Sequence, residues 1–207
     1  MKMTRRDVLG ALTAGAAAAL LPARADAATQ LEGYTVEPTA TVAGSKLQLN
    51  GAGVRRRAYF KAEMGALYLA SHQISFEGVF KAPGPKRIHL VILRDFSPNM
   101  AAKMFLSDFK ASASDEEYSA LLEEVRLMGE AYSRMARISR GDVVDCDWIP
   151  GTGFVPQVNG QMLLKAPIAS ERFFRVVLQN YVGTGAPADY RNALLGLGGA
   201  AETPAAG

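Results

Sequence analysis

KLQLNGAGVRRRAYFKAEMGALYLA, residues 46–70, is the stretch of the sequence that indicates the class of fold. Apolar and polar residues alternate over 46–49, which is the period of a half-buried β-strand. The segment Asn50 to Gly53 that follows has the composition of a turn. Aromatic and aliphatic residues then recur over 54–70 and predict a pair of strands. This part of the chain is therefore expected to form antiparallel β-structure.

Beyond this stretch the chain continues with strands and then changes to helices. Residues 75–81 are predicted to form a strand, a Pro-Gly-Pro sequence at 83–85 ends it, and residues 87–93 are the most apolar strand candidate. Ser97, followed by proline, has the pattern of a helix N-cap, and a second helix is predicted over 114–135 from a capping-box spacing. The apolar face of the first helix consists of Met100, Met104, Phe105 and Phe109.

After residue 142 the pattern returns to alternation. Val144, Cys146 and Trp148 are expected on one face of a strand. Asp145 and Asp147 are expected on the opposite face, exposed to solvent.

The remaining elements complete an α+β pattern. Asn159-Gly160 predicts a two-residue hairpin, a helix is expected from Ser170, and a short helix runs from Pro187 toward Leu195. Strands and helices do not alternate regularly. The sequence therefore predicts a large antiparallel sheet with helices packed on one face, and the space between the two layers is a common place for an apolar ligand.

The two ends of the chain differ in composition from the predicted domain. The first 27 residues contain the pair Arg5-Arg6, an apolar run of small residues and an Ala-x-Ala site, and are predicted to be a twin-arginine export signal cleaved near Ala27. The mature protein would then be periplasmic; a cut two residues earlier and the general secretory route are the alternatives. Residues 28–197 are expected to form one domain and 198–207 a disordered tail. No later stretch approaches the roughly 20 apolar residues of a membrane anchor.

The composition excludes several classes of function. The first 27 residues hold four of the 23 basic and two of the 20 acidic residues. The rest of the chain therefore carries 19 basic and 18 acidic residues and has no electrostatic basis for binding nucleic acid. Two histidines and one cysteine, Cys146, have no metal-binding spacing, and no cofactor is expected. The sequence at 151–153, Gly-Thr-Gly, is predicted to be a turn because no phosphate-binding or serine-hydrolase motif accompanies it.

Three consecutive arginines at 55–57 are the most unusual feature of the predicted strands. In a strand, Arg55 and Arg57 share one face and Arg56 lies on the other. A guanidinium that enters an apolar cavity needs an anion, either an acidic side chain or a ligand carboxylate or phenolate, because an unpaired buried charge is costly. The alternative is a basic surface edge with Glu63 as an internal partner.

Several short motifs follow one another along the chain. They are LNGAGVR at 49–55, FK at 60–61, GALYL at 65–69, GD at 141–142, PGTG at 150–153, NG at 159–160, FF at 173–174, VG at 182–183 and LLG at 194–196. Their order resembles the chalcone isomerase-like family, in an exported bacterial branch. The resemblance covers residues 44–196 and implies an open-faced β-sandwich, in which a large antiparallel sheet carries helices on one side. It also implies that Arg55 is the arginine that anchors the anionic nucleophile of a chalcone in the enzymes of the family.

Other positions that the resemblance assigns to the site differ from the plant enzymes. Glu63 stands in place of a threonine and Met100 in place of a tyrosine. A helix lysine is kept as Lys103, whereas Ser107 and Asn180 stand in place of an asparagine and a threonine. Loss of the hydrogen bonds that orient the substrate, and a carboxylate beside the arginine, argue against chalcone cyclisation. The predicted ligand-binding residues are Arg55, Glu63, Met100, Lys103, Ser107 and Asn180.

Three functions are compatible with these patterns. The first is binding of a small apolar carboxylate such as a fatty acid, which related members of the fold bind, with Arg55 at the polar end of a pocket. The second is an isomerase, an intramolecular lyase acting on another phenolic or enone substrate, with Lys103 or Glu63 in acid–base roles. The third is a periplasmic structural protein that binds a protein partner. The candidate walls of the pocket, for which plain core is the alternative interpretation, are Leu67, Met100, Met104 and Phe105.

Overall fold

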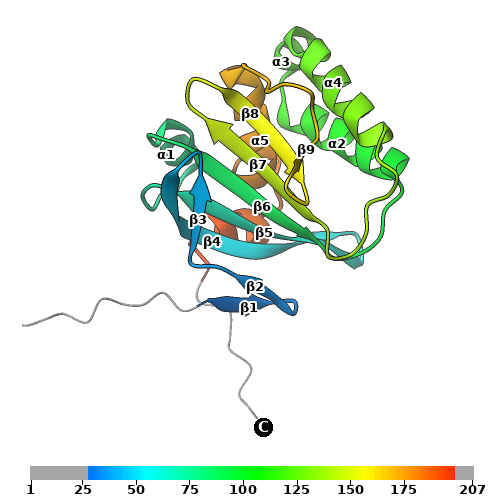
Figure 1. The fold of residues 1–207 in the computed structure, drawn as a ribbon. Coiled ribbons are helices and arrows are strands. Elements are labelled where there is room, and N and C mark those ends of the chain that lie inside the picture. Colours follow the sequence, from blue (N-terminus) through cyan, green and yellow to red (C-terminus); the bar gives the residue numbers. More distant parts are fainter. Residues whose placement is uncertain (1–27, 199–207) are drawn as a thin grey trace, which may run out of the picture.

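The computed structural model describes residues 28–198. The predicted export signal, 1–27, and all but the first residue of the predicted tail lie outside the described residues. Nine strands and six helices occur within 28–198 (Figure 1). The strands are β1 (Thr29–Leu31), β2 (Tyr34–Val36), β3 (Thr39–Val42), β4 (Ser45–Arg57), β5 (Phe60–Leu69), β6 (Lys86–Ile92), β7 (Val143–Ile149), β8 (Gly153–Val158) and β9 (Gln161–Met162). The helices are α1 (Phe76–Lys81), α2 (Pro98–Ser112), α3 (Asp115–Ala120), α4 (Leu122–Ser133), α5 (Glu171–Val182) and α6 (Ala188–Leu194).

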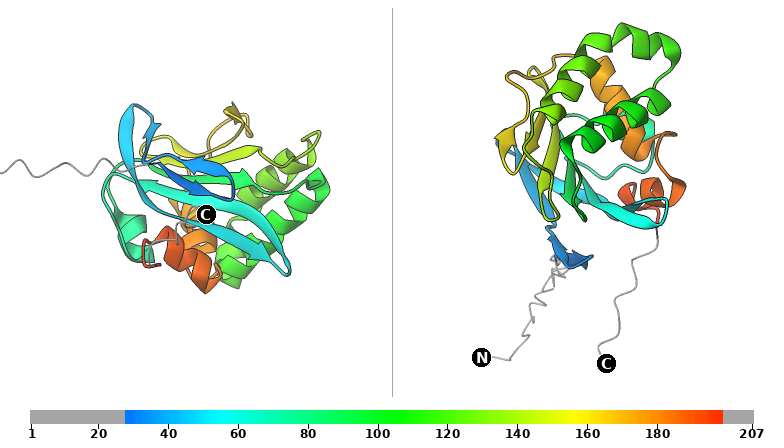
Figure 2. Two further views of the ribbon diagram at one scale, coloured as in Figure 1. Left: turned by 90° about the horizontal axis from the view of Figure 1, so that it is seen from below. Right: turned by 90° about the vertical axis from the view of Figure 1, so that its right-hand side faces the viewer.

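Seven strands form one antiparallel sheet in the order β3-β4-β5-β6-β7-β8-β9, so neighbours in the sheet are also neighbours along the chain. The β1–β2 hairpin is a separate two-stranded unit. The sheet is curled, and the helices lie on one side of it (Figure 2). The predicted α+β architecture, an antiparallel sheet with helices on one face, is confirmed. No helix in the described part of the chain is long and apolar enough to cross a lipid bilayer.

Two hydrophobic clusters stabilise this arrangement, one on each face of the sheet. The larger cluster lies between sheet and helices and contains stacked aromatic rings. Phe109 packs on Phe173 with ring centroids 5.0 Å apart, and Trp148 packs on Phe174 at 5.1 Å. The smaller cluster lies on the opposite face. Its buried members are Val36, Val42, Leu47, Met64, Ala66, Tyr68, Val91 and Leu93.

The segment 50–53, predicted to be a turn, lies within β4, so that prediction was wrong. Its glycines allow α6 to approach the strand closely. A Cβ on Gly53 would lie 2.7 Å from the Cβ of Ala193, and a Cβ on Gly51 would overlap with the carbonyl oxygen of Ala193. Glycine inside a strand often marks such a close approach. The turn that joins β4 to β5 begins at Ala58, which has a φ of 49°.

The helix caps and the hairpin turn, which depend on residues close together along the chain, were predicted correctly. The hydroxyl oxygens of Ser97 and Ser170 accept hydrogen bonds from the backbone N–H three residues further on, at the starts of α2 and α5. Asn159 and Gly160 both have positive φ, 50° and 76°, as a tight hairpin between β8 and β9 requires.

Residues 75–81 form a helix instead of the predicted strand. The hydroxyl of Ser75 caps α1 by accepting from the N–H of Gly78 at 3.1 Å. Phe76 and Phe80, one turn apart, stack with ring centroids 6.2 Å apart. The backbone hydrogen bonds of this short segment are therefore made within a capped helix and not to a neighbouring strand.

The single helix predicted over 114–135 is divided into α3 and α4. The capping box of Ser114 and Glu117 is confirmed at the start of α3. Leu121 separates the two helices, because its φ of −114° and ψ of 15° depart from helical values. Its side chain is buried at 3% exposure, so the bend points an apolar residue into the core.

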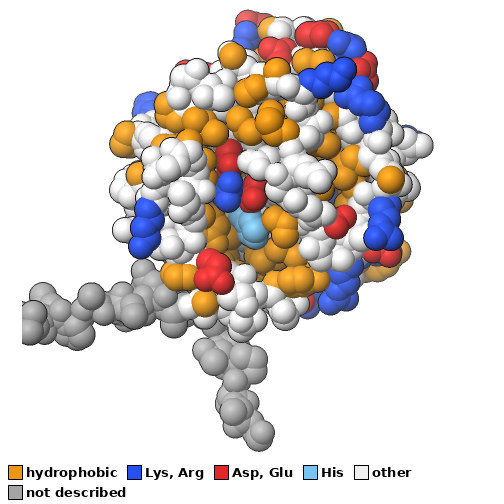
Figure 3. Space-filling model, viewed as in Figure 1, with side chains coloured by type: hydrophobic (Ala, Val, Ile, Leu, Met, Phe, Trp, Pro, Cys, Tyr) orange, Lys and Arg blue, Asp and Glu red, His pale blue; other side chains and the backbone are white. Residues whose placement is uncertain are grey.

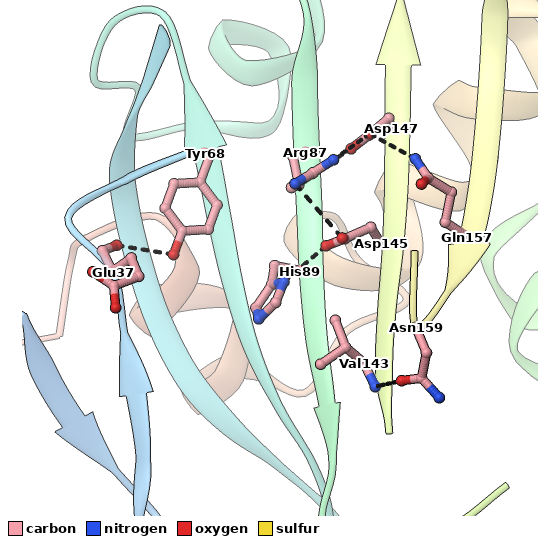
Figure 4. A network of polar contacts seen from close by, with 9 residues as sticks. All are labelled: Glu37, Tyr68, Arg87, His89, Val143, Asp145, Asp147, Gln157 and Asn159. Carbon is pink, nitrogen blue, oxygen red and sulfur yellow. Dashed lines mark hydrogen bonds and ion pairs between the residues drawn. The ribbon is translucent and has the colours of Figure 1, made fainter. Parts of the chain in front are cut away.

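The face of the sheet opposite the helices carries a charged network at its centre (Figures 3 and 4). Arg87 on β6 donates to both carboxylate oxygens of Asp147 on β7, at 2.7 and 2.6 Å. His89 Nδ1 lies 2.7 Å from Asp145 Oδ1. The two aspartates do face away from Cys146, as predicted, but the expectation of a solvated face was wrong because Asp147 is only 1% exposed. Cross-strand partners on β6 cover and neutralise them.

Candidate functional site

Two arginines of β4 and two carboxylates form a polar cluster between the sheet and the helix layer. Arg55 and Arg57 share one face of β4, as the alternation predicted, whereas Arg56 is exposed. Glu63 is the antiparallel partner of Arg55 on β5, and Asp108 extends from α2. Side-chain exposure falls from 23% for Arg57 through 12% for Glu63 to 5% for Arg55. The cluster therefore leads from the surface into the interior.

Arg57 is held by a bidentate contact with Asp108. Its Nη1 donates to Asp108 Oδ1 at 3.1 Å, and its Nη2 donates to Asp108 Oδ2. The Nε–H of Arg57 is buried and donates to no atom of residues 28–198. One donor of this guanidinium is therefore free for a ligand or for water.

Arg55 is held mainly by α5. Its Nη2 donates to Asn180 Oδ1 at 2.9 Å, and its guanidinium lies 5.8 and 5.9 Å from the ring centroids of Tyr181 and Tyr190. Its closest approach to Glu63 is longer, 3.8 Å between Nη1 and Oε1. The alternative of a basic surface edge is therefore wrong for Arg55, which is buried, whereas Glu63 is one of its partners.

Tyr190 reaches Arg55 because β5 has no side chain at Gly65. A Cβ at that position would overlap with the hydroxyl of Tyr190. The same lack of side chains at Gly51 and Gly53 seats α6, the helix that carries Tyr190. The glycine-rich pattern around the arginines thus positions the ring against which Arg55 packs.

A small cavity adjoins the cluster, between β5, β6 and β7 on one side and α2, α4 and α5 on the other. Its volume is about 80 Å³. A second space of about 20 Å³ lies deeper in the core and shares Phe105, Tyr132, Asn180 and Tyr181 with the first. The polar end of the first cavity consists of Arg57, Glu63, Asp108, Asn180 and Tyr181. Its apolar walls include Leu90, Ile92, Phe96, Met104, Phe105 and Val144.

Glu63 is a buried carboxyl group of the cavity, and its surroundings shift its pKa. The pKa of Glu63 is raised, mainly because the group is buried. The charge of Asp108 also raises this pKa, whereas the charges of Arg55 and Arg57 lower it. Its Oε1 is buried and accepts no hydrogen bond within the described structure. Burial also raises the pKa of Tyr181 well above its usual value, so this hydroxyl stays neutral.

The structure brings together half of the predicted site residues. Glu63 and Asn180 both contact the guanidinium of Arg55. Arg55 itself does not line the cavity, but both of these partners do. The other three, Met100, Lys103 and Ser107, are exposed on α2 and do not line the cavity.

The helical period explains why those three side chains point away. The cavity side of α2 consists of Ala101, Met104, Phe105 and Asp108, which are spaced three and four residues apart. Met104 and Phe105 are therefore walls, as predicted. Leu67, another predicted wall, belongs to the buried core and does not line the cavity. Sequence reasoning missed Asp108, although it lies one turn after Met104.

Other hollows and side-chain clusters provide weaker candidates. A groove of about 510 Å³ runs between α4 and residues 164–170, but the glutamates Glu123 and Glu130 at its edge are already paired with Arg126. Within residues 28–198, no three potential ligands are grouped to hold a metal ion. The exposed large apolar side chains are spread over several helices, strands and loops and are Tyr59, Ile74, Met100, Leu122, Met162 and Leu197.

The fold and the site define a helix-covered antiparallel sheet in which Arg57 lies at the polar end of a cavity with apolar walls and the buried Arg55 lies behind it. Residues 28–196 match the family described as chalcone isomerase-like, and the chain belongs to that family. A solved structure, the fatty-acid binding protein of Arabidopsis thaliana, is similar to this chain at 16% sequence identity with a TM-score of 0.64. The similarity covers 79% of this chain and 92% of the Arabidopsis chain, and it shows a shared fold. No curated protein matches the chain.

Proposed function

We propose that this protein binds a small apolar carboxylate, such as a fatty acid, in the cavity between the sheet and the helices. The observation that carries the proposal is that Arg57, with Arg55 behind it, stands at the polar end of a cavity whose remaining walls are apolar. Guanidinium groups recognise carboxylates, and apolar walls accept a hydrocarbon tail. The description of the Arabidopsis protein as a fatty-acid binding protein supports the same ligand class.

In the proposed complex, Arg57 makes the direct contact with the ligand carboxylate. It lines the cavity, it is the more exposed of the two arginines, and its Nε–H is free. Arg55 adds positive charge from behind and fixes the side chain of Asn180, which lines the cavity. This division of roles modifies the expectation that Arg55 forms the polar end of the pocket.

A long acyl tail needs more room than the cavity has. Pockets for drug-sized ligands typically enclose roughly 300–1,000 Å³, against about 80 Å³ here. Phe105 lines both the cavity and the deeper space, and Met104 is only partly buried. Because methionine is flexible, a shift of these two side chains would join the spaces and lengthen the cavity. We expect α2 to move away from the sheet when a long acid binds.

Arg57→Met should weaken laurate binding roughly 10- to 100-fold, because a hydrogen bond to a charged group contributes about 1.5–3 kcal/mol. Isothermal titration calorimetry of laurate into the wild type and the variant measures this change. Arg56→Met is the matched control, since Arg56 is the exposed neighbour on the same strand and should leave the affinity unchanged. Equal affinities for the wild type and Arg57→Met would contradict the proposed anchor.

The first 27 residues, we further propose, direct export through the twin-arginine route. The support is the order of the arginine pair, the apolar run and the Ala-x-Ala site in the sequence. Replacing Arg5 and Arg6 with lysines should retain the protein in the cytoplasm while preserving the charge. Fractionation of bacterial cells that express the full chain tests this, and unchanged periplasmic recovery would favour the general secretory route.

An isomerase is the second candidate function, and the environment of Glu63 is the observation that favours it. A buried carboxyl with a raised pKa beside two arginines has the properties of a general acid or base. Lys103, the other proposed acid–base residue, is exposed away from the cavity. Turnover of a phenolic enone by the wild type, abolished in Glu63→Gln, would favour catalysis over binding.

A further inference from the structure

We propose that the cavity takes up one proton when it binds its carboxylate ligand, and that Glu63 holds this proton. This inference rests on the proposed function and concerns the same site. It assigns Glu63 a second role in recognition, as the donor of a hydrogen bond to the ligand.

The balance of charge at the site is the first argument. Arg55 and Arg57 face Glu63 and Asp108, so two positive charges already meet two negative ones. A ligand carboxylate would add a third negative charge to a site where side-chain exposure is between 5% and 23%. Because an uncompensated charge in such surroundings is costly, binding favours neutralisation of one carboxylate.

Hydrogen bonding identifies which carboxylate is neutralised. Both oxygens of Asp108 already accept hydrogen bonds from the guanidinium of Arg57, so neither is free to take a proton. Glu63 Oε1 accepts no hydrogen bond in the described structure, and the nearest guanidinium nitrogen of Arg55 is 3.8 Å away. Protonation of Glu63 therefore breaks fewer hydrogen bonds than protonation of Asp108 would.

The other ionisable groups around Glu63 do not compete for the proton. Burial raises the pKa of the surrounding tyrosines and of the thiol, so these groups are already protonated, and the arginines stay charged. A nearby ligand carboxylate raises the pKa of Glu63 further, since like charges disfavour ionisation. The groups that face Glu63 are Arg55 and Arg57 on β4, Asp108 on α2, Tyr132 on α4, Cys146 on β7, Tyr181 on α5 and Tyr190 on α6.

In the complex, the protonated Glu63 donates its O–H to one oxygen of the ligand carboxylate. Two carboxyl groups that share one proton are a stable arrangement in proteins, because two adjacent like charges are avoided. No covalent bond forms or breaks apart from the transfer of this proton to Glu63 from the acid form of the buffer, which is left as its conjugate base. An alcohol or ester of the same chain length brings no negative charge and should bind without proton uptake.

The test is calorimetric titration with laurate, below its micelle concentration, in buffers of equal pH but different ionisation enthalpy. The difference in heat between phosphate and Tris gives the number of protons taken up. The wild type should approach one proton per laurate as the pH is raised, and its affinity should then fall about tenfold per pH unit. Glu63→Gln should bind laurate with no proton uptake and no such pH dependence. Glu116→Gln, a change at a glutamate whose side chain is 90% exposed, is the matched control and should behave as the wild type.

The outcomes separate this inference from the function on which it rests. Laurate binding without proton uptake at any pH would overturn the inference and leave the proposed function intact, and so would proton uptake that persists in Glu63→Gln. Absence of laurate binding would overturn both. Should Glu63→Gln fail to fold, infrared difference spectra of the wild type with carboxyl-¹³C laurate decide the question. A new protonated-carboxyl band at the unlabelled position supports Glu63, and a band only at the labelled position contradicts it.

Discussion

Gly51→Ala should lower the free energy of unfolding by about 3 kcal/mol, which corresponds to a fall in Tm of roughly 6–12 °C. The added Cβ would overlap with the carbonyl oxygen of Ala193 and would lie 2.7 Å from that of Leu194 and 2.9 Å from the backbone nitrogen of Gly196. Backbone atoms cannot rotate away as a flexible side chain does, so the C-terminal end of α6 must shift. Urea unfolding followed by circular dichroism measures the loss.

A glycine with space around it provides the control. Gly129 lies in α4, and a Cβ there would be 3.7 Å from the Leu106 side chain, an ordinary contact. Gly129→Ala should therefore raise the free energy of unfolding by roughly 0.5–1 kcal/mol, through the higher helix propensity of alanine. Similar losses in both variants would show that the close approach of α6 to β4 is not what makes Gly51 necessary.

Arg55→Met should destabilise the fold by about 3–5 kcal/mol, the range for removing one member of a buried ionic group. Methionine keeps much of the apolar volume but leaves the Asn180 side-chain oxygen without its donor. It also leaves Glu63 and Asp108 with Arg57 as their remaining cation in the cluster. Differential scanning calorimetry and urea unfolding measure the change.

The loss in Arg55→Met should grow as the pH rises. The pKa of Glu63 is raised in the folded state, so the folded protein holds the proton more tightly than the unfolded chain and stability falls as the pH rises through the folded pKa. Arg55 lowers that pKa, and its removal therefore extends the loss to higher pH. The difference in urea midpoint between the two proteins should be larger at about pH 8 than at about pH 5, and Glu63→Gln in the same variant should restore part of the stability. A difference that shrinks with pH would contradict this assignment.

The elements that the sequence predicted correctly depend on residues close together along the chain. Ser97 and Ser170 cap helices within a single turn, and Asn159-Gly160 closes a hairpin between adjacent strands. Gly51 and Gly53 were misread as a turn because glycine marks both a turn and a close backbone contact. Only the position of α6, near the end of the described chain, distinguishes the two.

The site was predictable in part for a similar reason. Strand alternation placed Arg55 and Arg57 on one face of the strand, which the structure shows to be the inner one, and the resemblance to the family assigned Glu63 and Asn180 to the same site. On α2, however, the resemblance selected positions that are one residue away from the cavity side. The apolar period through Met104 and Phe105 indicated the correct face, and Asp108 lies on it.

The sequence did not reveal the pairing of Arg57 with Asp108. This contact bears directly on ligand binding, because both residues line the cavity. It joins β4 to α2, so the position of α2 depends on this ion pair. A ligand carboxylate that binds the free Nε–H of Arg57 would share the charge of this arginine with Asp108 and so loosen the helix that closes the cavity. The same event would make room for the apolar tail.

The measurement that tests the central claim most directly is calorimetric titration of the wild-type protein with laurate and with dodecanol. The two ligands share an apolar tail and differ in the charge of the head group. Recognition by the arginine pair predicts saturable binding of laurate that is at least about tenfold tighter than that of dodecanol. Equal binding of the two ligands, or no binding of either, would contradict a carboxylate site at this cavity.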